Sequence, residues 1–313
     1  MKIIDSILKS TYFINHPPVL IDIGASGEIN AKWKPIAKYS ICLAFDADDR
    51  EFHITEQTNR DYKKLLIFNR IVTAEPTGND SFYLTASPYC SSLLEPDTEK
   101  LEPWFFKPLF AITKITSLPT ITLQQSFLQA GITYVDWFKA DTQGTDLRLF
   151  KSLPDTMKEK ILMAEFEPGI LDAYKGEDKL HEVMNEMPRL GFWLSSMKIK
   201  GTQRLHSGYS HKIGPFMSKR ILRSSPGWGE ISYIKQPNFA DRRRLLLLFV
   251  FAMLERQYGF ALEVADAALK HFSDSVFHEC KNAAMSKIQY EKRKIPLVIL
   301  KRKLNKLFAN IHD

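Results

Sequence analysis

The sequence predicts a doubly wound, mainly parallel α/β fold with a separate helical region at its C-terminal end. Two observations predict the sheet: short apolar runs end in turn residues, as buried parallel strands do, and helix-compatible segments alternate with them. The third observation is that only helical periodicity occurs after residue 240. We therefore expect a sheet domain over residues 1–239 and a helical appendage over residues 240–313.

Seven segments fit the strands of this sheet. The first, residues 19–24, is separated by about two dozen residues from the second, residues 39–46, which leaves room for a crossover helix. The other five are expected at residues 65–74, 135–141, 161–166, 191–197 and 230–235. Residues 81–85 alternate in hydropathy, as an antiparallel or edge strand does.

Helical spacing fills most of the segments between the strands. One helix is expected before the first strand, at residues 3–13, and another in the crossover that follows this strand. Four more are expected at residues 49–62, 122–130, 144–152 and 179–190. The C-terminal region should contain helices at residues 242–258, 261–272 and 275–290. Residues 86–120 contain several prolines and are expected to be irregular. Because such long loops are uncommon without a use, this segment suggests a lid or a substrate-binding insertion.

The composition indicates a folded, soluble protein. Hydrophobic residues make up 44% of the 313 residues and charged residues 25%, close to the average for globular domains. The three cysteines lie far apart and offer neither a disulfide framework nor the spacing of a zinc site, so we expect no structural zinc. We assign no metal-binding residues; Asp46, Asp141 and Glu165 could in principle converge on a divalent metal, but their spacing does not require one. No signal-peptide pattern begins the chain, and the longest apolar run, residues 245–254, is about half the length that spans a bilayer. We expect a cytoplasmic protein.

The net charge of +7 is concentrated in the C-terminal tail. Residues 287–313 hold eight Lys and Arg against two acidic residues, which gives +6 and leaves about +1 for the other 286 residues. A near-neutral body argues against nucleic acid as the main partner. The tail alternates basic clusters with apolar residues, so on a helix it would either lie on an anionic membrane surface or pack as a solvated helix end.

The first candidate site motif ends the first strand and reads Asp22-Ile-Gly24-Ala25-Ser26-Gly27. Small residues at a strand-to-helix turn let backbone N–H groups approach a ligand at a helix N-terminus. The spacing does not match the dinucleotide fingerprint G-x-G-x-x-G, and a tight turn without a ligand is the alternative interpretation.

Acidic residues end three further strands. Asp46 follows the second, where a carboxylate can accept both hydroxyls of a ribose or else simply begin a helix. Asp141 follows the fourth and would face the same crevice as Gly24 if the first and fourth strands are neighbours; helix capping is its alternative. Glu165, beside Glu167, ends the fifth and would either point into the crevice or form a solvated acid pair.

Histidines and aromatic residues complete the set of candidates. His206 and His211 lie in a polar segment between the last two strands, where a histidine could take a proton near neutral pH or be merely exposed to solvent. The cluster Trp104-Phe105-Phe106 and Trp137 could stack on a sugar or an apolar ligand, although core packing explains Trp137 at least as well.

Five elements, in this order and spacing, resemble the FkbM family of S-adenosylmethionine-dependent methyltransferases over roughly residues 18–236. They read VLIDIGASG (19–27), LAFDAD (43–48), SSLLEP (91–96), ITLQQSFLQAGITYVDWFKADTQGTDLRLFKSL (121–153) and ILMAEFEP (161–168). The family's fourth-strand motif is K-x-D-x-E-G. Lys139, Asp141 and Gly144 match it, whereas Gln143 replaces the glutamate.

The resemblance implies a Rossmann-like methyltransferase sheet of seven strands with S-adenosylmethionine as the cofactor. The residues that it assigns to the cofactor are, for the methionine part, Asp22, Gly24, Ala25, Ser26 and Gly27, and for the ribose, Asp46 with its neighbour Ala47. Methyl transfer to a hydroxyl is an in-line displacement, which requires alignment and help for the hydroxyl to lose its proton. Asp141 is the first candidate for a group near the transferred methyl, Glu165 the second and His206 the third.

The main hypothesis is therefore an O-methyltransferase that acts on a hydroxyl of a sugar or glycan, as in a surface polysaccharide or glycolipid. The acceptor class rests on the resemblance, because a fold does not determine its chemistry. Three alternatives stay open: methylation of a secondary-metabolite hydroxyl; an inactive binding module, in keeping with Gln143; and a peripheral membrane adaptor that acts through residues 287–313.

Overall fold

The computed structural model describes residues 2–25, 29–47 and 61–309 and divides the chain into two compact units. One unit is Thr11–Gln236, and the other combines Met1–Ser10 with Pro237–Asp313. The division lies close to the expected one at residue 240, but the first helix belongs to the helical unit. The physical reason is that α1 (Lys2–Leu8) buries Ile4, Ile7 and Leu8 and packs against the C-terminal helix.

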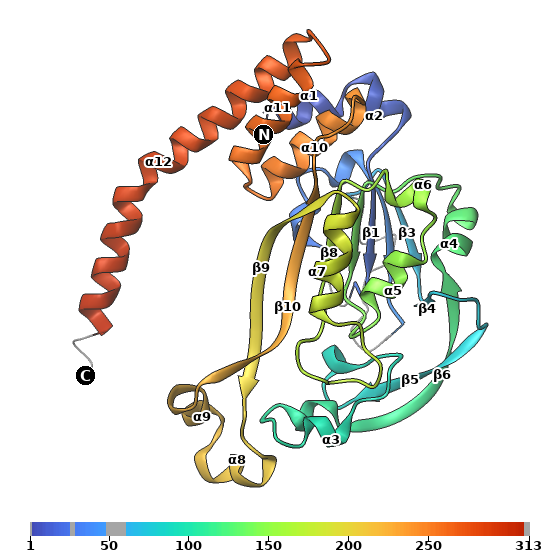
Figure 1. The fold of residues 1–313 in the computed structure, drawn as a ribbon, viewed down its shortest axis with the longest axis vertical. Coiled ribbons are helices and arrows are strands. Elements are labelled where there is room, and N and C mark those ends of the chain that lie inside the picture. Colours follow the sequence, from blue (N-terminus) through green and yellow to red (C-terminus); the bar gives the residue numbers. More distant parts are fainter. Residues whose placement is uncertain (1, 26–28, 48–60, 310–313) are drawn as a thin grey trace. The chain divides into compact units, whose positions relative to one another are not determined.

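The larger unit is built on a seven-stranded sheet with the order β3-β2-β1-β7-β8-β10-β9 (Figure 1). Its strands are β1 (Val19–Ile23), β2 (Ile41–Phe45), β3 (Lys64–Phe68), β7 (Trp137–Ala140), β8 (Met163–Phe166), β9 (Phe192–Gln203) and β10 (Ser224–Lys235). Neighbours from β3 to β8 run parallel, and β10 runs antiparallel to β8 and β9. A mostly parallel α/β sheet is thus confirmed, and its order is consistent with a Rossmann-like fold.

The central strands are apolar because both of their faces are buried. All five residues of β1 are buried, and aromatic rings pack over β7 and β8, with the Phe138 and Phe150 centroids 5.3 Å apart and those of Phe150 and Phe166 5.5 Å apart. The helices that supply this layer of the core are α4 (Leu123–Ala130), α5 (Asp146–Lys151) and α7 (Leu180–Arg189). Thr122 begins α4 with a capping box, and Gly131 ends it at φ 69°.

The crossover between β1 and β2 differs from the expectation. In its described part, residues 29–40, it contains two short 3₁₀ helices, η1 (Ala31–Trp33) and η2 (Ala37–Tyr39), instead of an α-helix. Pro35 stands between them, and a proline inside an α-helix removes a hydrogen bond and clashes with the preceding turn. The helix expected at residues 49–62 lies almost entirely outside the described residues.

A second, three-stranded sheet replaces two of the expected features. It has the order β4-β6-β5, with β4 (Ile71–Thr73) parallel and β5 (Asn79–Thr85) antiparallel to β6 (Ile112–Thr122). The single strand expected at residues 65–74 is therefore wrong: the chain leaves β3 at the polar pair Asn69–Arg70, and β4 joins the other sheet. The irregular segment expected at residues 86–120 is also wrong in part, because its last nine residues, 112–120, belong to the long strand β6.

The rest of that segment contains only short helices: η3 (Pro88–Cys90), α3 (Thr98–Leu101) and η4 (Lys107–Phe110). Strands β9 and β10 also extend well beyond the expected ranges and form a long antiparallel arm (Figure 1). The polar loop expected between them is instead a pair of helices, α8 (Ser207–Ile213) and α9 (Pro215–Ile221). Two further short helices of this unit are α2 (Thr11–Asn15) and α6 (Asp155–Lys158).

The smaller unit is helical, as expected. In addition to α1 it contains α10 (Arg242–Leu254), α11 (Tyr258–Leu269) and α12 (Ser275–Ala309). Helix α10 is buried on every side from Leu245 to Met253, which explains its uninterrupted apolar run. Helix α11 packs against both α10 and α12.

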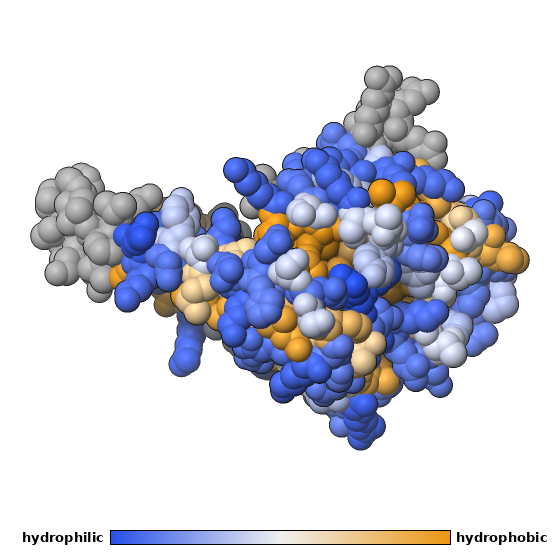
Figure 2. Space-filling view, turned by 90° about the horizontal axis from the view of Figure 1, so that it is seen from above, coloured by the Kyte–Doolittle hydropathy of each residue, from blue (hydrophilic) through white to orange (hydrophobic). Residues whose placement is uncertain are grey.

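The described helices do not include one that is both long and apolar enough to cross a membrane. The face shown in Figure 2 is mostly hydrophilic, with hydrophobic residues in smaller patches. A dominant apolar surface is therefore not a feature of this face.

Candidate functional site

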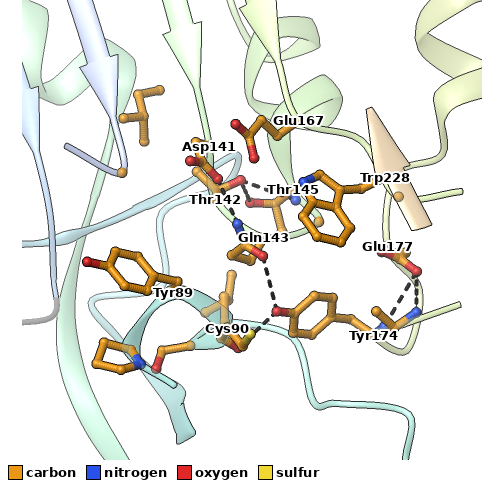
Figure 3. Close-up of a pocket in the computed structure, with 18 of the residues that line it drawn as sticks. Tyr89, Cys90, Asp141, Thr142, Gln143, Thr145, Glu167, Tyr174, Glu177 and Trp228 are labelled. Carbon is orange, nitrogen blue, oxygen red and sulfur yellow. Dashed lines mark hydrogen bonds between the residues drawn. The ribbon is translucent and has the colours of Figure 1, made fainter. Parts of the chain in front are cut away.

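A cavity of about 550 Å³ lies where β1, β2 and β7 end. In the sheet order β2 lies on one side of β1 and β7 on the other, so the direction of winding reverses between β1 and β7. Ligands of open α/β sheets bind at this switch point, beyond the carboxyl ends of the strands. The walls come from the ends of these strands, from residues 70–72, from Phe82, from residues 87–110, from residues 167–177 and from the start of β10 (Figure 3).

Gly24 forms the tightest contact at this point. It has a φ of 81°, and a Cβ placed there would lie 2.0 Å from the carbonyl oxygen of Asp141. Asp141 therefore does lie beside Gly24, because β1 and β7 are paired neighbours. The N–H groups of Gly24 and Ala25 both donate to the carbonyl of Phe45, at 2.9 and 3.1 Å. These two N–H groups thus close the turn and do not point to a ligand. The other two residues of the motif, Ser26 and Gly27, lie outside the described residues.

Asp22, expected to touch the cofactor, is instead a buried structural residue that does not line the cavity. Its Oδ1 accepts a hydrogen bond from Lys139 Nζ at 2.6 Å, and its Oδ2 accepts one from the backbone N–H of Asn30 at 2.9 Å. Burial opposes the charged form of Lys139, but the negative charges of Asp22, Asp141 and Glu165, with the hydrogen bond to Asp22, together outweigh this effect and raise the pKa of the ammonium group. The acid in the first motif thus holds the chain after β1 against β7.

Asp46 and Ala47 follow β2 and line the cavity, Asp46 as a buried side chain. The N–H of Asp46 donates to the carbonyl of Phe68 at 3.3 Å, which continues the pairing of β2 with β3. A carboxylate at this strand end has the chemistry to accept the hydroxyls of a ribose.

The motif after β7 forms a hydrogen-bonded network inside the cavity (Figure 3). Gln143 has a φ of 57°, and its Nε2 donates to Asp141 Oδ1 at 2.7 Å, while its Oε1 accepts from the Tyr174 hydroxyl at 3.3 Å. Ser92 Oγ donates to the Gln143 carbonyl at 2.8 Å. The amide that replaces the expected glutamate therefore gives Asp141 a neutral donor where a glutamate would add a second negative charge.

Asp146 joins the ends of β7 and β8. Its Oδ1 accepts from the N–H and hydroxyl of Thr142, and its Oδ2 accepts from the N–H of Glu167 at 2.7 Å. Burial and the nearby Asp141 raise its pKa to about 7 in spite of these hydrogen bonds. This side chain fixes the backbone that carries Glu167.

Glu167, the first residue after β8, is the acid that faces the cavity beside Asp141 (Figure 3). Burial raises its pKa to about 9, and the negative charges of Asp141, Asp146 and Glu230 add to the effect. Asp141 accepts a hydrogen bond from Gln143, and Glu230 pairs with Lys200 at 2.8 Å. The Glu167 carboxyl group has no such partner among the described residues, so it is open to a ligand.

Two of the expected catalytic residues lie elsewhere. Glu165 does not line the large cavity. It accepts hydrogen bonds from Trp137 Nε1 at 2.8 Å, Lys32 Nζ at 2.8 Å and Asn30 Nδ2 at 3.1 Å, and it borders a smaller cavity of about 190 Å³. His206 is exposed, and its Nε2 lies 2.6 Å from Glu102 Oε1, outside both cavities.

The aromatic residues divide between core and cavity. Trp137 is fully buried, as the packing interpretation expected, and Trp104 is nearly so. Phe106 lines the cavity and stacks on Trp228, with the ring planes 5° apart and the centroids 6.4 Å apart. Tyr174 lines it too, and its hydroxyl donates to the Cys90 carbonyl at 2.9 Å.

Sequence reasoning missed several residues of the site. Glu167 could have been predicted, because it is an acid directly after a strand, and the same criterion selected Asp141. Trp228 and Glu230 had none, since the last strand was expected to begin only at residue 230, and Tyr174 lies in an unremarkable loop.

Among residues 2–25, 29–47 and 61–309, no three metal-ligating side chains are arranged to hold a metal ion. Compared with known proteins, the sequence matches no protein-family model, and it shows no significant similarity to any curated protein.

Proposed function

We propose that the chain is an S-adenosylmethionine-dependent O-methyltransferase whose acceptor is a hydroxyl of a sugar or glycan. The observation that carries the proposal is the large cavity at the switch point of the sheet, with Asp46 at the end of β2 and Asp141 at the end of β7. The two strand ends lie on either side of β1 and carry one acid each, which matches the division of a nucleoside-containing ligand into a ribose side and a reactive side. The motif resemblance to the FkbM family supports the same assignment.

The residues present fit this cofactor. Asp46 would hold the ribose hydroxyls, and the apolar wall of Ile71, Val72 and Phe45 suits a flat, weakly polar ring system beside it. When bound, S-adenosylmethionine supplies a methyl group already activated on a positively charged sulfonium. The half-buried carboxyl groups of Asp141 and Glu167 line the cavity and suit a ligand that brings a positive charge.

Glu167 is the best candidate to take the proton of the acceptor hydroxyl. Its carboxyl group faces the cavity without a hydrogen-bonding partner among the described residues, and burial raises its pKa to about 9. A nearby positive charge lowers the pKa of a carboxyl group, which brings Glu167 toward the neutral range in which a general base works best. Asp141, held by Gln143, would position the reacting groups without itself moving.

The acceptor end of the cavity has the chemistry of a sugar site. Trp228 is fixed by its stacking on Phe106, and the Tyr174 ring and the acid Glu230 line the same wall. Aromatic faces pack on the C–H surface of a sugar, and carboxylates accept its hydroxyl protons. This lining supports a polyhydroxylated acceptor over a purely apolar one.

The test begins with calorimetric titration of the full chain with S-adenosylmethionine and S-adenosylhomocysteine. We expect binding in the micromolar range, reduced at least about tenfold in Asp46→Asn, because a ribose held by a buried carboxylate loses charge-assisted hydrogen bonds. The matched control is Asp155→Asn, whose side chain is 88% exposed. Asp22→Ala is unsuitable because it would leave Lys139 without its buried partner.

Two results would decide against the proposal. A folded wild-type protein that binds neither compound contradicts the cofactor assignment. Binding without methyl transfer to any hydroxylated acceptor, measured with a methyl-labelled cofactor, would instead identify an inactive binding module. Loss of transfer but not of binding in Glu167→Gln would support its role as the proton acceptor.

A further inference from the structure

A second basic segment interrupts the chain between residues 187 and 229. It contains eight Lys and Arg and no Asp or Glu. Since the C-terminal tail carries +6, the remaining 243 residues carry −7. The near-neutral body expected from the sequence is therefore an average of an acidic body and this basic segment.

Most of the basic segment belongs to the arm formed by β9 and β10, and its centre forms the helices α8 and α9 at the end of the arm (Figure 1). We call residues 204–223 the tip. Helices α8 and α9 pack against each other, and the backbone N–H of Phe105 donates to the carbonyl of Gln203 at 3.0 Å where the tip begins. The tip is thus a projection that is anchored beside a wall of the large cavity.

Large apolar side chains are exposed on the tip. Tyr209, Phe216, Met217 and Ile221 each have between 48% and 65% of their surface exposed. A single exposed apolar residue is ordinary, but four within a short helical pair indicate a surface that is covered by a partner.

Cations accompany the two exposed aromatic rings. Arg220 lies with its guanidinium carbon 4.4 Å from the centroid of Phe216, and Lys212 Nζ lies 5.7 Å from the centroid of Tyr209. Arg223 is exposed as well. An apolar surface with basic groups at its sides is the pattern of a segment that lies in the interface of a membrane.

The base of the tip is fixed to the body of the unit. Arg204 lies over the Trp104 ring at 5.3 Å, and His206 pairs with Glu102 at 2.6 Å. Glu102 lies outside the tip, and residues 204–223 themselves contain no Asp or Glu. The outer part of the tip therefore combines apolar exposure with uncompensated positive charge.

We propose that the tip is a docking site for an anionic lipid bilayer, with Phe216, Met217 and Ile221 in the interface and Arg220 and Arg223 on the lipid phosphates. Nucleic acid fits the basic residues equally well, but it offers no environment that favours exposed Met and Ile side chains. The proposal is independent of the proposed methyl transfer, and it concerns a different segment from the basic C-terminal tail.

Vesicle co-sedimentation of the full chain tests the proposal. We expect binding to phosphatidylcholine vesicles that contain phosphatidylglycerol, weaker binding to phosphatidylcholine alone, and loss of binding as salt is raised. Each basic residue removed from an anionic surface weakens binding about fivefold, so Arg220→Glu with Arg223→Glu should weaken it at least about 25-fold. Phe216→Ser and Ile221→Ser should each weaken it about tenfold.

Matched controls lie on the same unit. Leu128→Ser removes an apolar side chain that is 84% exposed on α4, and Lys160→Glu reverses an exposed charge; both should bind as the wild type does. Circular dichroism checks that each variant is folded. The proposal is overturned if the wild type does not bind anionic vesicles, or if the tip variants bind them as strongly as it does, since the tail would then be responsible. It is also overturned if the tip variants lose affinity for DNA or RNA oligonucleotides but not for vesicles.

Discussion

Two polar clusters at the carboxyl ends of the central strands differ in how their charges are compensated. The first is a row across the sheet, in which Asp22, Lys139, Glu165 and Ser232 are register partners on β1, β7, β8 and β10. Here Lys139 pairs with Asp22, and Glu165 is occupied by Lys32 and its other donors. We call this set the sheet row.

The second cluster, which we call the cavity cluster, consists of Asp141, Gln143 and Glu167. Asp141 and Glu167 lie two residues beyond Lys139 and Glu165, just past the ends of β7 and β8, yet Glu167 has no ion pair among the described residues. Removing one partner of a buried ion pair is strongly destabilising, whereas a half-buried acid without an ion-pair partner favours a ligand that supplies a positive charge. Glu165 and Glu167 are two residues apart and illustrate this difference directly.

Removing the cation of the sheet row should have the largest effect. Lys139→Met leaves Asp22 buried and unpaired, so we expect the free energy of unfolding to fall by about 3 kcal/mol or more. Urea denaturation measures the change. The matched control is Lys32→Ala, whose Nζ also pairs with a carboxylate but whose side chain is 41% exposed, and which should lose less than about 1 kcal/mol. Equal losses in both variants would contradict the comparison.

Adding a charge to the cavity cluster should have the next largest effect. In Gln143→Glu a second carboxyl group replaces the donor that now lies 2.7 Å from Asp141. We expect a loss of about 2 kcal/mol at pH 8 that nearly disappears at pH 5, where the added group is protonated and can donate. Thermal unfolding at both pH values measures this difference. Gln143→Ala loses the same hydrogen bond without adding charge, so its deficit should grow less with pH than that of Gln143→Glu.

Replacing Glu167 with a residue that does not titrate should have a smaller effect on the free energy of unfolding, and this effect should change gradually with pH. Burial raises the pKa of this group from its ordinary value of 4.5 to about 9. A carboxyl group whose pKa is higher in the folded state than in the unfolded state contributes its full stability at pH values below the unfolded pKa. That contribution is lost as the pH rises from the unfolded pKa to the folded pKa. The wild type should therefore lose about 1 kcal/mol per pH unit between pH 7 and 8, and Glu167→Gln should lose clearly less.

Asp146→Asn is the comparison for that measurement. The pKa of Asp146 is raised only to about 7, so most of its titration is complete by the upper end of this range. The variant should keep most of the wild-type slope between pH 7 and 8 even though it is less stable overall. A wild-type slope that Glu167→Gln does not change would show that another group is responsible.

Much of the fold followed from local patterns. The runs at residues 19–24, 135–141 and 161–166 are apolar because both faces of a central strand are buried, and the structure has β1, β7 and β8 there. The predictions were less successful where local signals conflict. Pro119 and the flanking polar residues concealed β6, and Pro35 prevents the first crossover from forming the expected helix.

By itself the sequence determined the central strands β1, β2, β7 and β8 and the strand ends that carry Asp46 and Asp141, because burial and turn chemistry act over a few residues. Only the tertiary structure decided which acids are neutralised and which face the cavity. Asp22 and Glu165 find their partners across register positions on other strands, and Trp228 and Tyr174 reach the cavity from segments far apart in the chain. Such pairings depend on distances between strands, which residue order does not contain.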